Sequence, residues 1–421
     1  MTAISRAQGL ADQWRSHAPR LSMWPAIETA LVVLALLLFS QALLGPLLAD
    51  PADPEGGEIL RLIWPPVYLL TLGLVALNPA PFMRSALAAW PLLLLAVLTL
   101  LSAQWSLDPA ITLRRGLGVV MTLVFGIWLA ARYSWVDLIR LIALMFGILA
   151  VGSFLAGLLA PGFAVMNEIH VGAWKGLWWE KNTLGGYMAW GSLSFVAAAI
   201  VTPFRIERRI WGGLAILGIA LVLLSTSRTA LLALMIGVAG PVAIALTRQG
   251  FGFAALAFFS AACGVMALMG VLIVGPTVIL EALGRDPTLT GRTDIWVVLI
   301  DMIADRPWTG YGYGAFWQVE NGPVFWVRQI TVWPVPTAHN AWLETALSLG
   351  LPGVALAVLA VGRGLVQAIV KLFRGPAAYW ALPFLISWLG VSLSESNLLV
   401  QNGLIWLLLA ATLAKLATRT R

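Results

Sequence analysis

The chain has 421 residues, of which 60% are hydrophobic and 11% are charged. Soluble domains carry roughly 25% charged residues, so this composition excludes an ordinary soluble protein and requires a lipid bilayer as solvent. A single cysteine, Cys263, excludes an internal disulfide, and three histidines leave little room for a histidine metal site. The net charge of +7 does not indicate nucleic acid, because the basic residues are scattered between apolar segments, as in membrane proteins.

Apolar segments follow one another along almost the whole chain. A spanning helix needs about 20 apolar residues. The windows that qualify are 26–48, 60–78, 86–103, 113–131, 138–160, 183–202, 210–225, 229–247, 251–281, 341–362, 378–394 and 398–415. We therefore predict an all-α polytopic membrane protein with about 12 transmembrane helices. Residues 26–283 would hold the first nine, 284–338 a large outer loop, and 339–421 the last three helices and a short tail.

The charge distribution predicts the orientation. Residues 1–25 are polar and basic, and the apolar run after them is too long for the core of a cleavable signal peptide. With this tail in the cytoplasm, most of the 26 lysines and arginines fall on the cytoplasmic side, as the positive-inside rule requires. An even number of spans returns the basic C-terminus to the same side, so we predict that both termini are cytoplasmic.

The predicted outer loop contains an amphipathic helix from Thr293 to Asp305, which Pro307 ends. Its aspartates share one line on the helix, and apolar residues cover much of the rest. The helix is too short to span, so we expect it to lie at the interface or to cap a cavity. The acidic residues are too dispersed to name a metal site, and no metal or other cofactor is predicted.

Six chemistry-bearing residues lie in six segments that the predicted topology brings to the outer side. They are Lys175, Lys181, Arg228, Arg292, His339 and Glu395. Cations and a histidine gathered at one water-facing surface indicate that the protein handles an anion there. No Walker loop, zinc-binding HExxH or paired-cysteine motif is present in the sequence.

Lys175 and Lys181 alternate with tryptophans that include Trp178 and Trp179. This pattern suits a rim that binds phosphate and stacks on sugar rings, and it also suits an aromatic belt with snorkelling lysines. Lys181 leads directly into a helix, whose N-terminus adds positive potential and favours the functional interpretation.

Arg228 interrupts a long apolar stretch, where a charge usually faces a cavity, although an interfacial arginine is the alternative. Arg292 opens the loop helix, where a cation opposes the helix dipole and is better explained by a ligand than by solvation alone. Arg114 and Arg115 open the fourth span on the outer side and either join the site or anchor that helix.

His339 and Asn340 stand where the outer loop enters the tenth span. Histidine exchanges a proton near neutral pH, and the neighbouring amide could orient its ring. Glu395, between the last two spans, would orient His339 or form an ion pair with an arginine.

An aromatic run precedes these residues in the outer loop. Alternating glycines and aromatics, with Tyr311, Tyr313 and Trp317, suit carbohydrate stacking and equally well the packing of the loop.

Four segments, in chain order, resemble the O-antigen ligase and polymerase superfamily. WWEKNTLGGY (178–187) looks like its exopolysaccharide-polymerase branch, and the others are LLSTSRTALLAL (223–234), GRTDIWVVLIDMIADRPWTGYGYGAFW (291–317) and HNAWLETALSLGLPG (339–353). The resemblance covers roughly residues 170–400. It implies a glycosyltransferase of the bacterial inner membrane with a GT-C-like helical fold, acting on the periplasmic side without metal or nucleotide.

The resemblance also implies the substrates and the residues that bind them. The donor would be an oligosaccharide linked to a polyprenyl diphosphate, and the acceptor a sugar hydroxyl of another carrier-linked repeat unit. Arg228 and Arg292 would bind the diphosphate with help from Lys175 and Lys181, and His339 would act as the base, with Glu395 as runner-up. The glycan would contact Trp178, Trp179, Tyr311, Tyr313, Trp317 and Asn340.

Membrane lipids would surround the protein, and a flippase and a chain-length regulator are implied as partners by the family. Two alternatives stay open: a ligase that transfers the glycan to a lipid A core, and a transporter or flippase of lipid-linked sugars. A transporter would place its substrate-binding cations on both sides or at mid-depth and contain inverted repeats, whereas the motif charges here collect on one predicted side and no repeat is visible in the sequence.

Overall fold

A computed structural model describes residues 23–48, 58–168, 170–274, 292–331 and 335–418. Within these ranges the fold is helical, with one isolated bridge between Val165 and Trp174 and no extended strand. The predicted all-α class is confirmed. Residues 1–22 of the predicted tail and 284–291 of the predicted outer loop lie outside the described residues.

The helices of the first half of the chain are α2 (Met23–Phe39), α3 (Leu44–Leu48), α4 (Glu58–Leu77), α5 (Pro79–Ala88), α6 (Trp90–Leu101), the 3₁₀ turn η1 (Ser102–Gln104), α7 (Pro109–Arg132), α8 (Trp135–Leu159), α9 (Pro161–Ala164) and α10 (Lys181–Val201). Those of the second half are α11 (Arg205–Ser225), α12 (Arg228–Thr247), α13 (Phe251–Val274), α15 (Arg292–Asp305), α16 (Pro323–Thr331), α17 (Ala341–Val370), α18 (Ala377–Ser392) and α19 (Leu404–Ala417).

Each predicted span contains a helix, although the windows 26–48 and 86–103 are each divided between helices, and residues 275–281 of the ninth window lie outside the described residues. Among the described residues, 7 helices are long and apolar enough to cross a membrane, namely α4, α7, α8, α10, α11, α12 and α17. Four windows correspond to the shorter apolar helices Ala26–Phe39, Phe251–Ser260, Ala377–Ser392 and Leu404–Ala417. The protein is a multi-pass membrane protein, and the total of about 12 spans stays a prediction.

The window 86–103 is divided between α5 and α6, which are bent by 87° relative to each other. A helix that continued through this point would place Pro91 in its interior. Proline there lacks the N–H of the helical hydrogen bond and clashes with the carbonyl four residues earlier. The chain instead bends, and Pro91 occupies the first turn of α6, where it is tolerated.

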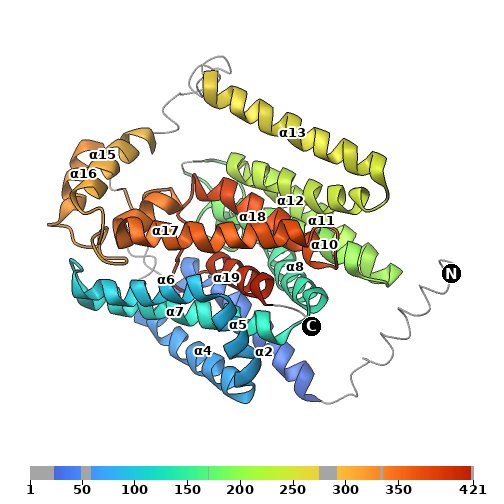
Figure 1. Ribbon diagram of the computed structural model, residues 1–421, viewed down its shortest axis with the longest axis horizontal. Helices are drawn as coiled ribbons and strands as arrows, with labels where there is room; N and C mark the ends of the chain where they lie inside the picture. Colours follow the sequence, from blue (N-terminus) through green and yellow to red (C-terminus); the bar gives the residue numbers. More distant parts are fainter. Residues whose placement is uncertain (1–22, 49–57, 169, 275–291, 332–334, 419–421) are drawn as a thin grey trace.

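Successive long helices run in opposite directions, so each end of the bundle collects the starts of some helices and the ends of the others (Figure 1). One end, here called the site end, collects the starts of α7, α10, α12, α17 and α19. At the opposite end Arg132 forms an ion pair with Glu28 at 2.7 Å, and Arg140 pairs with Glu207. The predicted cytoplasmic cations therefore gather at the end opposite the predicted outer residues.

Helices α7 and α19 approach each other through a glycine. A Cβ on Gly126 would lie 2.8 Å from the carbonyl oxygen of Leu407 and 3.2 Å from the backbone nitrogen of Ala411. Gly73 on α4 is the opposite case, with nothing within 4 Å of its Cβ position. The first glycine is thus required by close packing, and the second is not.

We expect Gly126→Ala to destabilise the protein by about 1–3 kcal/mol, the range for overpacking a tight contact. Gly73→Ala is the matched control and should be neutral or slightly stabilising, because alanine is the better helix former. Thermal denaturation of the purified variants in detergent measures both effects. Equal shifts for the two substitutions would contradict the backbone contact between α7 and α19.

A kink in α17 explains the glycine-aromatic run of the outer loop. Gly350 has a left-handed φ of 67° inside α17, which removes the helical partners of nearby carbonyls. The backbone N–H of Tyr311 donates to Leu347 O at 2.7 Å, and that of Gly312 donates to Ser348 O at 3.1 Å. Gly310 permits this approach, because its Cβ would lie 2.5 Å from Leu347 O. The glycine-aromatic run therefore supplies hydrogen-bond donors to the α17 carbonyls that the kink leaves without helical partners.

The described part of the outer loop has a hydrophobic core of its own. It gathers apolar residues of α15, the 311–317 turn, α16 and the start of α17, among them Ile295, Leu299, Phe316, Val324 and Leu347. The predicted amphipathic helix is present as α15, whereas α16 was not predicted. This loop packs over the site end beside α17 (Figure 1).

Candidate active site

Two cations lie together at the site end. Lys181 begins α10 and Arg228 begins α12, and the two are close enough for their charges to repel. Lys181 Nζ donates to the Thr226 hydroxyl at 3.2 Å, across the left-handed turn that ends α11. Both cations stand at helix N-termini, where the dipole is also positive. This is a strongly electropositive position suited to an anion.

Arg228 is exposed and Lys181 is half-buried. Ser227 caps α12 by accepting from the backbone N–H of Ala230 at 3.4 Å, which fixes the first turn that carries Arg228. Lys175 is half-buried in the preceding loop, where its backbone N–H donates to Ala164 O at 2.8 Å. Arg292 is the first residue of α15, and its side chain lies outside the described part of the structure.

The structure brings His339 and Glu395 together from segments more than fifty residues apart. Nδ1 of His339 lies 3.8 Å from a carboxylate oxygen of Glu395. Both side chains keep solvent access, at 26% and 31% of their surface. His339 has a left-handed φ of 46°, a conformation in which histidine, asparagine and aspartate are enriched. The predicted alternative that Glu395 orients His339 is compatible with this geometry.

The amide of Asn340 is used within the protein. Its Oδ1 accepts from the backbone N–H groups of Trp342 and Leu343, at 2.9 and 3.1 Å, and so caps α17. Its Nδ2 donates to Leu393 O at 3.2 Å, which ties the start of α17 to the end of α18. Asn340 therefore holds the backbone next to His339 and does not orient the ring through its side chain.

A cavity of ≈ 250 Å³, here the Glu395 cavity, is lined by Glu395 and by Glu180 and Asn182, the two chain neighbours of Lys181. Asn397 also lines it and is 9% exposed, and neither atom of its side-chain amide has a hydrogen-bond partner among the described residues. A buried amide of this kind is costly unless a ligand or water meets it.

A second cavity of ≈ 440 Å³, here the Glu344 cavity, adjoins the first, and both are lined by Ser396 and Val400. Glu344 is central to its wall. Its carboxylate accepts from the indole N–H of Trp317 at 2.7 Å and from the backbone N–H of Ala338 at 2.9 Å. Glu344 thereby ties the aromatic run to the backbone beside His339.

The predicted glycan-binding aromatics are largely packed inside the protein. Trp178 is 4% exposed and donates to Ser40 O, while Trp179 packs against Gly45. Tyr311 is buried and donates to Met302 O at 2.8 Å, and burial and the Asp305 carboxylate raise its pKa against the lowering effect of Arg306. Tyr313 and Trp317 are also buried, yet both line the Glu344 cavity.

Sequence reasoning missed Glu344 and Asn397. Glu344 was visible as an acidic residue in the first turn of the predicted tenth span, beside His339. A carboxylate at that helix position is normally explained by the helix dipole, so its role as an anchor for the loop was hidden. Asn397 stands two residues after Glu395 and carried no distinguishing signal, because its burial follows from the course of the 393–403 connection.

We expect Glu344→Ala to loosen the outer loop, because it removes the acceptor of two N–H groups, and each buried donor left unpaired costs about 1–3 kcal/mol. Glu320→Ala is the control, since Glu320 pairs with Arg328 while 83% exposed, and such pairs contribute little. Hydrogen exchange of residues 306–338 should accelerate in the first variant alone. Unchanged exchange in both would refute the anchoring role.

The fold and this site define a polytopic membrane protein with a cationic, water-accessible site at one end of its helical bundle. Residues 213–358, which contain Arg228, Arg292 and His339, match the family model described as O-antigen ligase. The chain is also 26% identical over 310 residues to the exopolysaccharide production protein ExoQ of Rhizobium meliloti, covering 70% of this chain and 67% of that protein. Both similarities confirm the resemblance to the O-antigen ligase and polymerase superfamily that the motifs indicated.

Proposed function

We propose that this protein is a polysaccharide polymerase that transfers a glycan from a polyprenyl-diphosphate carrier to a sugar hydroxyl of another carrier-linked repeat unit. The similarity to the O-antigen ligase family model and to the exopolysaccharide production protein ExoQ supports a role in polysaccharide biosynthesis as a polymerase or a ligase. The observation that carries the proposal is the Glu395 cavity, which is lined by Glu395, the partner of His339, and by Glu180 and Asn182, the chain neighbours of Lys181.

In the proposed reaction, the acceptor oxygen forms a bond to the anomeric carbon of the donor sugar. The bond from that carbon to the diphosphate breaks, and its electron pair leaves with the polyprenyl diphosphate. Lys181 and Arg228, with Lys175 and Arg292, would stabilise the negative charge that the diphosphate gains. The sugar–diphosphate bond supplies the free energy, so the proposal includes no metal.

The hydroxyl proton would pass to His339. Its Nδ1 faces Glu395, so Nε2 is the ring nitrogen that would accept the proton. The Glu395 carboxylate would then stabilise the imidazolium. A proton acceptor opposite the cations suits a displacement in which the nucleophile and the leaving group lie on opposite sides of the sugar ring.

The topology supports a periplasmic site in the inner membrane with both termini in the cytoplasm, because the end opposite the site carries the cations expected to face the cytoplasm. The name of the relative, an exopolysaccharide production protein, favours polymer formation. The family description, O-antigen ligase, favours transfer to a lipid A core and makes a ligase the second candidate.

The test is turnover by the purified protein in detergent with EDTA. It receives the polyprenyl-diphosphate oligosaccharide of its native pathway, and the products are sized on a gel. A ladder of lengthening products is expected. Transfer to added lipid A core without a ladder would make the protein a ligase. Neither product from folded protein would overturn both and favour a transporter of lipid-linked sugars.

A further inference from the structure

The wall of the Glu395 cavity contains buried polar atoms that the fold leaves without partners. Neither Oδ1 nor Nδ2 of Asn397 has a hydrogen-bond partner among the described residues, and the residue is 9% exposed. The same holds for the indole N–H of Trp190, which is 3% exposed, and both residues line the cavity. Buried polar atoms in folded proteins are nearly all paired, so these atoms indicate a ligand that completes them.

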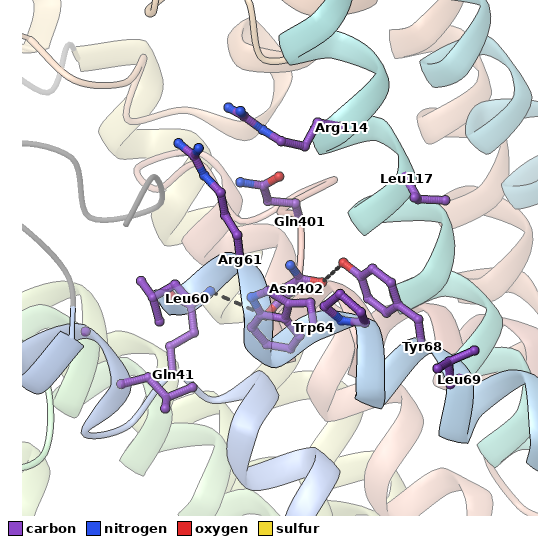
Figure 2. A pocket seen from close by; sticks show the side chains of 13 residues that line it. Gln41, Leu60, Arg61, Trp64, Tyr68, Leu69, Arg114, Leu117, Gln401 and Asn402 are labelled. Atoms are coloured by element: carbon purple, nitrogen blue, oxygen red, sulfur yellow. Dashed lines mark hydrogen bonds between the residues drawn. The ribbon is translucent and has the colours of Figure 1, made fainter. Parts of the chain in front are cut away.

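A larger cavity of ≈ 560 Å³, lined in part by α4 and α7, shows the usual arrangement (Figure 2). The Tyr68 hydroxyl donates there to Asn402 Oδ1 at 2.7 Å, and the backbone N–H of Asn402 donates to the Thr122 hydroxyl at 3.1 Å. The asparagine of that wall serves the fold. The amide of Asn397 has no such role among the described residues.

Other contacts hold Asn397 and Trp190 in place. The backbone N–H of Asn397 donates to Glu395 O at 3.0 Å. The ring of Trp190 packs against Phe384, with 6.3 Å between the ring centroids. The backbone and the ring are therefore fixed by the protein, while the amide and the indole N–H are left for a ligand. Such preorganised groups are typical of binding sites.

The charges of the wall disfavour a phosphate in this cavity. The described residues that line it include Glu180 and Glu395 but no lysine, arginine or histidine, and carboxylates repel an anion. Apolar side chains such as Val400 and Ile405 form much of the rest. The volume of ≈ 250 Å³ is several times the roughly 30 Å³ that one water occupies. The ligand that fits is a small neutral molecule with hydrogen-bonding groups and an apolar face, as a sugar ring has.

The position of the cavity indicates which sugar it would hold. Glu395 is the partner of His339, and the chain neighbours of Lys181 line the same cavity. In the proposed reaction, the base and the cation that binds the diphosphate act at one anomeric carbon. That carbon belongs to the sugar attached to the donor diphosphate.

We propose that the Glu395 cavity binds the diphosphate-linked sugar of the donor, and that Asn397 and Trp190 select this sugar through its ring hydroxyls. The amide both donates and accepts hydrogen bonds, and the indole N–H donates one. This inference rests on the proposed transfer reaction. It gives that reaction two specificity-determining residues, neither of which carries charge.

The test uses donors in which each ring hydroxyl of the diphosphate-linked sugar is replaced by hydrogen, one at a time. The wild type should use at least one deoxy donor with a kcat/KM lower by about 10²-fold or more, because the missing hydroxyl leaves a buried protein group unpaired. Asn397→Leu should lower kcat/KM for the native donor by a similar factor and leave the deoxy donor within about threefold. Equal use of all donors by the wild type, or discrimination that survives in Asn397→Leu, would overturn the assignment.

Trp190→Phe removes the N–H and keeps an aromatic ring against Phe384, so it should lower kcat/KM for the native donor by about tenfold, the effect of one hydrogen bond. Trp211→Phe is the matched control. The indole N–H of Trp211 also lacks a partner among the described residues, and its ring stacks on Phe195 at 6.4 Å, but it does not line this cavity. Equal losses in the two variants would contradict a role for Trp190 in the cavity.

Thermal denaturation without substrate separates sugar binding from a structural role. An amide that meets only the ligand contributes nothing to the empty protein, so Asn397→Leu should keep or raise the melting temperature while lowering transfer. A lower melting temperature together with wild-type discrimination would show that Asn397 supports the fold and would overturn the proposal.

Failure of the transfer reaction itself gives a different result. The wild type would then form no product, and calorimetry in detergent measures binding of a donor with carbon in place of the anomeric oxygen. Tighter binding of this compound than of its deoxy forms, lost in Asn397→Leu, would support the sugar site without the polymerase. Binding that does not depend on the hydroxyls, or no binding, would overturn the sugar site as well.

Discussion

Replacing His339 by asparagine should lower the rate of glycan transfer by about 10²- to 10⁴-fold, the range that a positioned general base contributes. Asparagine is chosen because His339 has a φ of 46°, and asparagine accepts this left-handed conformation while most residues do not. The loss then reports the missing imidazole and not a strained backbone. Single-turnover transfer with saturating donor and acceptor measures the chemical step.

His339→Gly adds a sharper readout. Glycine also tolerates the positive φ, and it leaves room where the ring was. Added imidazole should restore part of the activity of this variant and none of the activity of Arg228→Ala. Absence of rescue, together with an unchanged rate in His339→Asn, would show that His339 has no catalytic role.

Glu395 provides the matched comparison. Its carboxylate lies 3.8 Å from His339 Nδ1, beyond hydrogen-bond distance, so it would act on the imidazolium mainly through charge. Glu395→Gln should therefore cost about tenfold, or about 1.4 kcal/mol of activation free energy. If Glu395 were itself the base, the order of the two effects would be reversed.

The helices could be predicted because their signal is local. Apolar runs of spanning length appear in the sequence without knowledge of any partner, and each one contains a helix, although two of the runs are divided. The 87° bend between α5 and α6 was missed, although Pro91 is visible in the sequence. Proline is also common in straight transmembrane helices, so its presence did not specify a break.

The glycine-aromatic run shows what a local pattern leaves open. Sugar stacking and loop packing were both compatible with Tyr311 and Tyr313. The structure buries both residues: the backbone N–H of Tyr311 donates to a carbonyl near the Gly350 kink, and the backbone N–H of Tyr313 donates to the Ser102 hydroxyl. That kink lies nearly forty residues further along the chain, so nothing in the run itself could indicate its partner.

The site residues were partly predictable from the sequence. Charges in apolar surroundings marked Lys181 and Arg228, and their neighbouring positions followed from the topology. The approach of His339 to Glu395 was one of two alternatives. The cavities were not predictable, since the 393–403 connection that borders them is shaped by contacts with α4, α7 and the outer loop.

Arg228→Ala should also reduce transfer strongly, by about 10²- to 10³-fold, the cost of removing one preorganised group that stabilises transition-state charge. Lys181→Ala should have a related but smaller effect, because a lysine binds phosphate as a point charge and an arginine as a fork. Arg209→Ala, at the opposite end of the bundle, is the matched control and should retain activity.

Lys181 and Arg228 are close enough for their charges to interact, so removing each charge should weaken the positive potential at this position. If both act on one diphosphate, the double variant should lose less than the product of the two single losses, because groups that act as a unit are not additive. Fully multiplicative losses would indicate that the two cations act on different groups.

Product inhibition separates binding of the diphosphate from other effects. Free polyprenyl diphosphate should inhibit the wild type, and its inhibition constant should rise in Arg228→Ala, because in the proposed reaction the cation would bind the leaving group after the bond has broken as well as during the reaction. The same constant in His339→Asn should stay near the wild-type value, since the histidine would act on the acceptor. If Arg228→Ala loses turnover with unchanged inhibition, Arg228 does not bind the diphosphate, and the cations at the starts of α10 and α12 have another role.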